Sequence, residues 1–282
     1  MARYELLIHA RRAVVDGRIQ QAAVAVDGGV ISSVRTGSEA RDIGLAGDHT
    51  IDLGDDVVLM PGLVDPHVST EDVAVGTRSA ALGGITTVVD YGTNGDPSAT
   101  DPEQVDRWRE GVTGESSVDV GLWGAAVPGN LGRLGALLDR GVFGISAVAD
   151  GKGVAGTPTL NSEDLAAAAE EVAGRGGLFA ADAGVEDLPV LLDVCRRTGG
   201  RLHLRAVADA EELPLLRGAK AEGLRVTAST SPHLLALVSE VTHGGVAAAD
   251  LAVPGVVLAL ARLGPVPAGP VQMVGAGGDQ AV

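Results

Sequence analysis

The chain has 282 residues, 45% of them hydrophobic and 21% charged, and a mean hydropathy of +0.23, so the composition predicts a folded globular protein with a sizeable core. A formal net charge of −16 without any basic stretch argues against nucleic acid or an anionic membrane as a partner. Aromatic residues make up only 2%, and the single cysteine, Cys195, excludes an internal disulfide and a cysteine-based zinc site.

The first part of the chain, residues 1–59, is a series of short β-type runs. Turn signals such as Val15-Asp16-Gly17 and Asp27-Gly28-Gly29 separate these runs, so the sequence predicts a small β-sandwich domain. The N-terminus lacks an apolar segment followed by a cleavage site, and no run in the chain reaches the ~20 apolar residues needed to span a bilayer. We therefore expect a cytoplasmic protein.

After Pro61 the pattern changes to apolar strands that alternate with longer helical stretches, which is typical of βα units around a parallel sheet. Candidate strands cover residues 62–68, 85–92, 118–127, 141–148, 177–182, 201–206, 224–230 and 270–277. Candidate helices cover residues 77–84, 102–112, 130–140, 162–175, 188–200 and 213–223. The sequence thus predicts an α/β fold, a TIM-barrel-like (β/α)8 barrel over residues 60–282.

The helix expected at residues 162–175 has the clearest boundaries. Ser162 stands at its start, where the hydroxyl is expected to accept a hydrogen bond from a free amide of the first turn. Glu163 and Asp164 place carboxylates at the positive end of the helix dipole. Gly174 and Gly176 are suitable residues for its end. Ser162 is therefore predicted to be the N-cap.

Several ordered segments resemble the cyclic amidohydrolases, most closely the allantoinase and dihydropyrimidinase (hydantoinase) type, with dihydroorotase as a further relative. They are PGLVDPHV, GTRSAALGGITTVVDYGTN, VDVGLWGAAVPGNL, LLDRGVFGIS and VTASTSPHLLAL. The resemblance covers about residues 4–237, while residues 238–282 match poorly and the chain ends where the family continues. It implies the amidohydrolase barrel with an N-terminal β-sandwich, in a degenerate and C-terminally shortened form.

The resemblance also implies a reaction at two divalent metals, which polarise a ring amide and activate water. The family's ligands are two histidines after strand one, a carboxylated lysine after strand four, histidines after strands five and six, and an aspartate after strand eight. His67 retains the first ligand, and the remaining positions are Ser69, Ser146, Ala180, Ala206 and the ambiguous Asp279. Because so few ligands do not hold zinc, no binuclear zinc centre is expected.

Other polar residues lie near the expected carboxyl ends of the strands, where barrel sites form. The candidates for acid or base catalysis are His67, Asp90, His203 and His233. The candidates for substrate binding are Asn94, Ser146, Arg205 and Ser231. For Asp90, Asn94 and His203 the alternative is a hydrogen-bonded place inside the barrel, and for His233 a structural role between loop and helix. Lys152 lies in a glycine-rich loop, where a solvated position is the favoured interpretation.

Three functions are compatible with this pattern. The favoured hypothesis is a pseudoenzyme, an allantoinase-like barrel without its metals that is retained for binding or assembly, as a homo-oligomer or with a pathway enzyme. The second is a metal-independent enzyme that acts on a small cyclic amide or ureide. The third binds such a compound without turnover. The pseudoenzyme is favoured because ligands are lost from several strands and no new acid–base cluster is evident.

Overall fold

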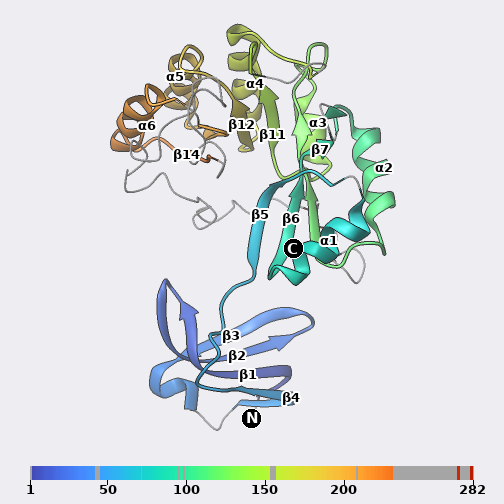
Figure 1. The fold of residues 1–282 in the computed structure, drawn as a ribbon, viewed down its shortest axis with the longest axis vertical. Helices are drawn as coiled ribbons and strands as arrows, with labels where there is room; N and C mark the ends of the chain where they lie inside the picture. The colour runs from blue at the N-terminus through green and yellow to red at the C-terminus, as the bar shows by residue number, and fades with distance from the viewer. Residues whose placement is uncertain are drawn as a thin grey trace, which may run out of the picture. The chain divides into compact units, whose positions relative to one another are not determined.

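The chain forms two compact units, Met1–Gly62 and Leu63–Val282 (Figure 1). The computed structural model describes residues 2–41, 45–70, 72–93, 96–97, 99–152, 157–207, 209–230, 272–273 and 280–281. The first unit is rich in strands, and the second alternates strands with helices.

The described residues of the first unit contain one four-stranded sheet with the order β3-β2-β1-β4. Its elements are β1 (Ala2–Val15), β2 (Arg18–Asp27), β3 (Val30–Thr36), the 3-10 helix η1 (Gly37–Arg41) and β4 (Leu45–Leu53). β1 pairs antiparallel with β2 and parallel with β4. Leu7, Ala23 and Ala25 of the sheet form a small core with Ala40 of η1. Both predicted turns are present, with Gly17 at φ +72° and Gly28 at φ +60°.

The second unit contains parallel strands that follow one another in chain order. They are β5 (Leu63–Val68), β6 (Ile85–Asp90), β9 (Asp119–Leu122), β10 (Gly124–Ala125), β11 (Ile145–Val148), β12 (Leu178–Asp182), β13 (Arg201–Leu204) and β14 (Val226–Ala228). β9 belongs to the sheet β5-β6-β9, and β10 belongs to the sheet β10-β11-β12-β13-β14. Only Trp123 separates β9 from β10, so this segment connects the two sheets into one succession.

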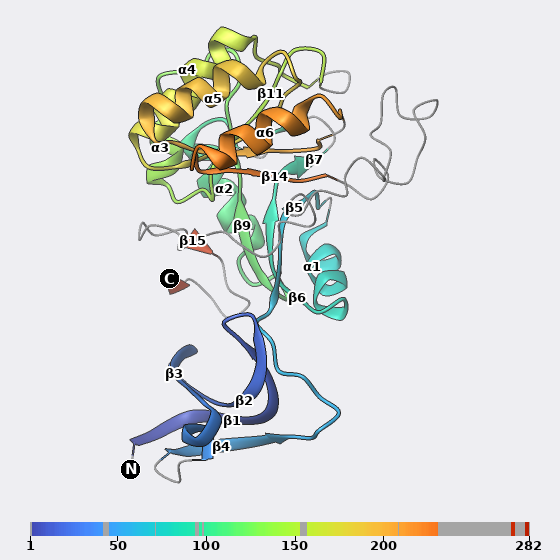
Figure 2. The same ribbon diagram turned by 90° about the vertical axis from the view of Figure 1, so that its left-hand side faces the viewer.

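Apart from the direct connection between β9 and β10, a helix lies between each strand of this succession and the next, as Figures 1 and 2 show. The helices are α1 (Val73–Leu82), α2 (Pro102–Val112), α3 (Leu134–Asp139), α4 (Ser162–Gly174), α5 (Leu188–Thr198) and α6 (Glu212–Ala221). Leucines and alanines dominate the core between helices and strands. Small side chains allow the close helix-on-strand packing that the barrel requires.

The expected eighth strand, residues 270–277, lies mostly outside the described residues. Its described part is β15 (Gln272–Met273), which pairs antiparallel with β16 (Gln280–Ala281). A short hairpin, β7 (Gly92–Thr93) with β8 (Asp96–Pro97), follows β6. The alternation predicted from the sequence is thus confirmed for the strands from β5 to β14.

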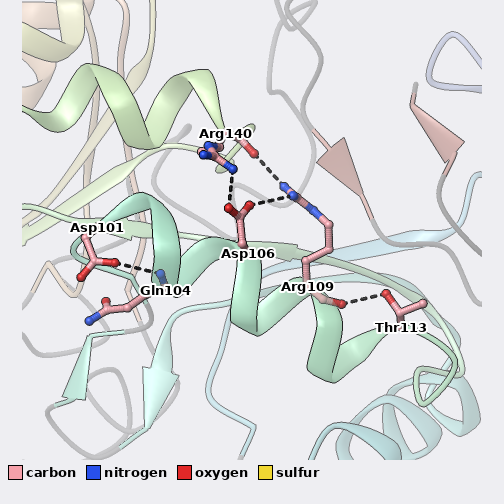
Figure 3. Close-up of polar contacts among 6 residues, drawn as sticks. All are labelled: Asp101, Gln104, Asp106, Arg109, Thr113 and Arg140. Carbon is pink, nitrogen blue, oxygen red and sulfur yellow. Dashed lines mark hydrogen bonds and ion pairs between the residues drawn. The ribbon is translucent and has the colours of Figure 1, made fainter.

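Helix α2 has the bounds predicted from the sequence, and its polar contacts show why (Figure 3). Asp101 accepts a hydrogen bond from the Gln104 amide at 2.8 Å, and Thr113 donates to the Arg109 carbonyl at 2.7 Å. Asp106 forms ion pairs with Arg109 and with Arg140, the residue that follows α3. These contacts close both ends of α2 and connect it to the end of α3.

Helix α4 corrects one prediction. Its N-cap is Asn161, whose side-chain oxygen accepts from the Asp164 amide at 2.9 Å. Ser162 is instead the first helical residue, and its hydroxyl donates to the buried carboxylate of Asp187 at the start of α5. The predicted cap is one residue too late because Ser162 has a stronger acceptor on the neighbouring helix.

Candidate functional site

Polar side chains from four strands meet at the carboxyl ends of the parallel strands. His67 is the second-to-last residue of strand β5, and Tyr91 follows β6 directly. Asp182 is the last residue of β12, and Arg205 follows β13. Because the strands are parallel, these positions lie at the same end of the sheet. Direct contacts join all four side chains.

A bulge in β5 sets the position of His67. The pairing of β5 with β6 shifts register between Asp65 and Val68, because Pro66 has no amide hydrogen to donate. The Pro66 carbonyl accepts from the Trp123 indole at 2.8 Å, and the His67 amide donates to the Asp65 carboxylate at 3.1 Å. The Asp-Pro pair therefore turns the backbone at the residue that carries the imidazole.

Tyr91 lies against both His67 and Arg205. The His67 and Tyr91 rings are stacked, with centroids 4.7 Å apart and an angle of 25° between their planes. The Cζ atom of Arg205 lies 3.9 Å from the centroid of the Tyr91 ring, which is a cation–π contact. Arg205 Nη2 also donates a hydrogen bond to the Tyr91 hydroxyl. One aromatic ring thus fixes the position of the guanidinium.

Arg205 and Asp182 form an ion pair inside the unit. Arg205 is only 2% exposed, and its Nη2 donates to Asp182 Oδ2 at 3.1 Å. The Arg205 amide donates to the Ala181 carbonyl at 2.8 Å, which anchors its backbone to β12. Arg205 Nε and Nη1 and Asp182 Oδ1 are buried without hydrogen-bond partners. Burial raises the pKa of Asp182, while the charges of Arg205 and Lys152 act in the opposite direction.

His203 lies on β13 with both ring nitrogens engaged. Nδ1 is 2.8 Å from the Thr227 hydroxyl, and Nε2 is 3.0 Å from the Ser229 hydroxyl. Burial, followed by the charges of Arg205 and His67, lowers the pKa of His203 to about 4. Desolvation, followed by the Arg205 charge, also lowers the pKa of His67 to about 4. Both imidazoles are therefore neutral at pH 7.

Strand register aligns three of the residues that the sequence singled out. Ser146 of β11 pairs with Ala180 of β12, which pairs with His203 of β13. Ser146 is buried and donates to the Gly124 carbonyl at 3.0 Å, and Ala180 is fully buried. Ala206 is outside this row, since it lies two residues beyond β13 with φ +52°, in the left-handed region. The row therefore offers one imidazole, at His203.

The remaining predicted residues have different positions. Asp90 is 5% exposed and accepts from the Thr70 hydroxyl at 2.8 Å, as expected for a hydrogen-bonded residue inside a barrel. Other candidates lie outside the described residues: Asn94, Ser231, His233 and Asp279. The structure thus brings His67 and Arg205 together and adds Tyr91, which is absent from the predicted set. The sequence signal that could have identified Tyr91 is its position at the end of the strand predicted over residues 85–92, in a chain with only two tyrosines.

In the part of the chain that the structure describes, no group of three or more histidine, cysteine, aspartate or glutamate side chains is placed to hold a metal ion. The described helices also include none that is long and apolar enough to cross a membrane. A groove of about 740 Å³ lies between the start of α2 and helices α3 and α4. In this groove Glu171 accepts from the amides of Gly132 and Gly135, and Arg175 pairs with Asp139, so its charges serve the packing of α3 and α4.

The chain is similar to several known proteins. No protein-family model matches it. It is 36% identical over 281 residues to an allantoinase from Streptomyces avermitilis, and the match covers 87% of this chain and 62% of that protein. A probable allantoinase from Oryza sativa subsp. japonica is 30% identical over 289 residues, with 84% of this chain and 56% of that protein covered. The chain thus spans about 60% of the length of these relatives.

Among solved structures, the L-hydantoinase (dihydropyrimidinase) from Arthrobacter aurescens superposes with a TM-score of 0.71. Sequence identity to it is 21%, over 84% of this chain and 60% of that chain. This similarity confirms the predicted class of fold, an α/β barrel of the (β/α)8 type. The strands that carry His67, Tyr91, Asp182 and Arg205 are part of that barrel.

Proposed function

Because the chain belongs to the cyclic amidohydrolase superfamily, on its allantoinase-like and hydantoinase-like side, we propose that it is a barrel without a binuclear metal centre, with a non-hydrolytic role in binding or assembly. The main support is the chemistry at the family's ligand positions. Ser69, Ser146 and Ala180 occupy three of them, and none of these side chains is an imidazole or a lysine. A centre with two metals needs more ligands than remain.

The strand register supports a revised position for the strand-six ligand. His203 aligns with Ala180 and Ser146, so we assign that position to His203 in place of Ala206. Its two nitrogens already contact the hydroxyls of Thr227 and Ser229. A neutral imidazole has one lone pair, and a metal would have to displace one of these contacts.

The buried guanidinium of Arg205 gives further support. Its charge lowers the pKa of both His67 and His203, so it lies within electrostatic reach of both imidazoles. A second cation bound by these imidazoles would be repelled by it in a medium of low dielectric constant. The described residues therefore do not fit a binuclear centre.

Metal analysis tests this proposal. We expect elemental analysis of protein purified without chelator to find well under one zinc per chain, and incubation with allantoin, hydantoin, dihydrouracil or dihydroorotate to give no turnover. An active relative purified in the same buffers shows whether the procedure itself removes metal. About two zinc ions per chain would refute the proposal, whatever the assays give.

A metal-independent enzyme that acts on a small cyclic amide or ureide is the second candidate. It is favoured by His67, which is unprotonated at pH 7 and lies near the Arg205 cation. With a pKa of about 4, however, His67 is a weak base, which is why this candidate comes second. If a natural substrate is turned over, His67→Ala should abolish the reaction, and an unchanged rate would remove His67 from the mechanism.

The proposed assembly role implies a homo-oligomer or a complex with another enzyme of the same pathway. Ile19, Val30 and Ile31 of the first unit are 60%, 60% and 63% exposed, and apolar side chains at such exposure favour contact with another protein surface. Light scattering after gel filtration gives the number of copies, and native pull-down with intact mass identifies a partner. A monomer without a partner would leave binding as the proposed role.

A further inference from the structure

One side of the sheet in the first unit carries aliphatic side chains in two neighbouring rows. Strand pairing gives each row one residue from each strand, in the order β3-β2-β1-β4 (Figure 1). The first row is Val34, Val24, Ile8 and Ile51, and the second is Ile31, Val26, Leu6 and His49. Both rows lie on the same side of the sheet, because alternate residues of a strand point the same way. The seven aliphatic side chains of these rows form the apolar face.

The apolar face is open to solvent, whereas the other side of the sheet is covered. None of the seven side chains is buried. Those on the two edge strands, Ile31, Val34 and Ile51, are 63%, 44% and 45% exposed. On the other side, Leu7 and Ala25 are 2% and 0% exposed and pack with η1. A sheet is stable when its apolar side packs against another layer, and the described residues supply that layer on one side only.

The next row on the same side as the apolar face is already buried. It contains Ala22 of β2 and Ala10 of β1, which are 1% and 2% exposed. These two residues pack with Ala13 and with the partly buried Val15 and Leu59. The cover ends at this row, so the apolar face is the open continuation of a small core.

Charge makes a second copy of this chain a suitable partner for the apolar face. Neither of the two rows contains Asp, Glu, Lys or Arg, whereas the other side of the same strands carries Glu5, Arg35, Asp48 and Asp52. Two copies with a net charge of −16 each repel one another wherever their charges meet. Contact through an uncharged surface avoids this repulsion at short range. A twofold axis provides the matching uncharged surface, because the same face is present on both copies.

The size of the apolar face predicts a weak dimer. Eight positions at the spacing of a sheet, about 4.8 Å between strands and about 6.8 Å between rows, expose on the order of 400 Å² per copy once the relief of the side chains is included. Two copies packed face to face therefore bury about 800 Å² in total, which is at the lower end for specific interfaces. Such contacts are transient, so the dissociation constant should lie between about 10 and 300 µM.

From these observations we propose that the apolar face is a homodimer interface, at which the four-stranded sheets of two copies pack face to face around a twofold axis. The two sheets then form a β-sandwich, of which the described residues of one chain supply one sheet. This inference names the surface for the assembly role proposed above and rests on that role.

Sedimentation equilibrium of the full chain, at concentrations from about 5 to about 500 µM, tests the proposal. We expect a reversible equilibrium between monomer and dimer. Dimer affinity should rise severalfold between about 0.05 and about 0.5 M NaCl, because salt screens the repulsion between two acidic chains. A monomer throughout this range would overturn the proposal, and so would a dimer that salt weakens, since its interface would depend on ion pairs.

Matched glutamate variants locate the interface. Ile31→Glu places a carboxylate in it, and Val75→Glu on α1 is the control, since both side chains are 63% exposed and both changes add one negative charge. Ile31→Glu should weaken the dimer about tenfold or more, because the carboxylate would be buried without a partner, and Val75→Glu should change the affinity less than about twofold. Ile51→Glu on the other edge strand should act as Ile31→Glu does. Equal effects of Ile31→Glu and Val75→Glu, or none from Ile31→Glu, would overturn the assignment.

Circular dichroism of each variant shows whether the fold is retained. If Ile31→Glu does not fold, Ile31→Thr takes its place, since it keeps a β-branched side chain in the strand. Ile31→Thr should weaken the dimer severalfold, and unchanged affinity would overturn the proposal.

Two further measurements separate this inference from the alternatives. Flotation with uncharged phosphatidylcholine vesicles shows whether the apolar face binds lipid, and binding that Ile31→Glu abolishes would overturn the dimer in favour of a membrane surface. Zinc content is measured on the same samples. About two zinc ions per chain would refute the proposed function, whereas a zinc-free monomer would refute only the dimer interface.

Discussion

Arg205 connects several strand ends through one side chain. It follows β13, contacts Tyr91 after β6, lies near the Ala147 carbonyl in β11 and pairs with Asp182 at the end of β12. A cation at the centre of such contacts ties the strand ends together, and it also keeps the neighbouring imidazoles neutral. At the scale of single residues, removal of Arg205 should therefore destabilise the second unit.

The first prediction concerns removal of this charge. Arg205→Met leaves the Asp182 carboxylate without its counter-ion and should reduce the free energy of unfolding by about 2–4 kcal/mol in urea denaturation. Replacing both partners, Arg205→Met with Asp182→Leu, should recover a large part of the loss. The control is Arg197→Met, whose half-exposed pairs with Glu170 and Asp193 predict a change within about 0.5 kcal/mol.

The second prediction concerns pH. The pKa of His203 is lowered to about 4, so between pH 6.5 and 4 the unfolded chain binds a proton that the folded chain does not. Stability should therefore be complete above pH 6.5 and fall as the pH falls, by at most about 1.4 kcal/mol per pH unit for one such group.

His203→Gln isolates this effect, because Gln keeps polar contacts to hydroxyls but does not titrate. Urea denaturation of both proteins at several pH values gives the difference in slope, in which the contributions of His67 and Asp182 largely cancel. Parallel curves for the two proteins would show that His203 does not take up a proton on unfolding.

Sequence patterns identified part of this site and missed the rest for a physical reason. His67 and Arg205 were predicted because polar residues at strand ends are informative by themselves. Tyr91 was not, because its role depends on Arg205, which is 114 positions away in the chain. Thr227 and Ser229 were not predicted either, because their hydroxyls reach the ring nitrogens of His203 only through the pairing of neighbouring strands. The spacing of these residues in the sequence does not indicate that contact.

At the scale of elements, helix α4 shows that the N-cap predicted from local sequence can be wrong by one residue. Asn161 and Ser162 are both good N-caps, and local propensity does not decide between them. The choice is made by Asp187 at the start of α5, which accepts from the Ser162 hydroxyl and leaves the cap to Asn161. Helix bounds are thus predictable from sequence to within a residue, while cap identity depends on the neighbouring helix.

The third prediction follows from this arrangement. Asn161→Ala removes the bond to the Asp164 amide and should lower the free energy of unfolding by about 1 kcal/mol, whereas Asn161→Ser should restore most of it. Thermal denaturation of the two variants provides the measurement. If Ala and Ser at position 161 give the same stability, the cap assignment is incorrect.

The glycine directly before β11, Gly144, gives the fourth prediction. A Cβ at Gly144 would lie 2.6 Å from Trp123 Cζ3 and 2.7 Å from the Leu178 carbonyl oxygen, so Gly144→Ala should destabilise the second unit by about 1–3 kcal/mol. Gly111 in α2 has open space at the same atom, and Gly111→Ala should stabilise by about 0.5–1 kcal/mol. Urea denaturation of both variants should show shifts of opposite sign.

At the scale of the whole molecule, the alternation of strands and helices made the barrel predictable. Strands β9 to β12 are buried at almost every residue, whereas the helices between the strands combine buried and exposed positions, and this contrast is visible in sequence. The region after residue 230 has no comparable contrast, so the expected eighth strand had the weakest support. The sequence alone shows which residue types stand at the expected ligand positions. That His203 lies beside Ala180 follows only from the strand register, which the structure provides.

The positions of the two tryptophans have a consequence for how unfolding is observed. Trp108 lies in α2, and Trp123 lies between β9 and β10 in edge-to-face contact with Phe143, so both belong to the second unit. Indole fluorescence therefore reports on the barrel alone, whereas far-ultraviolet circular dichroism reports on both units. If the two signals change at different denaturant concentrations, the four-stranded sheet and the barrel are separate cooperative units.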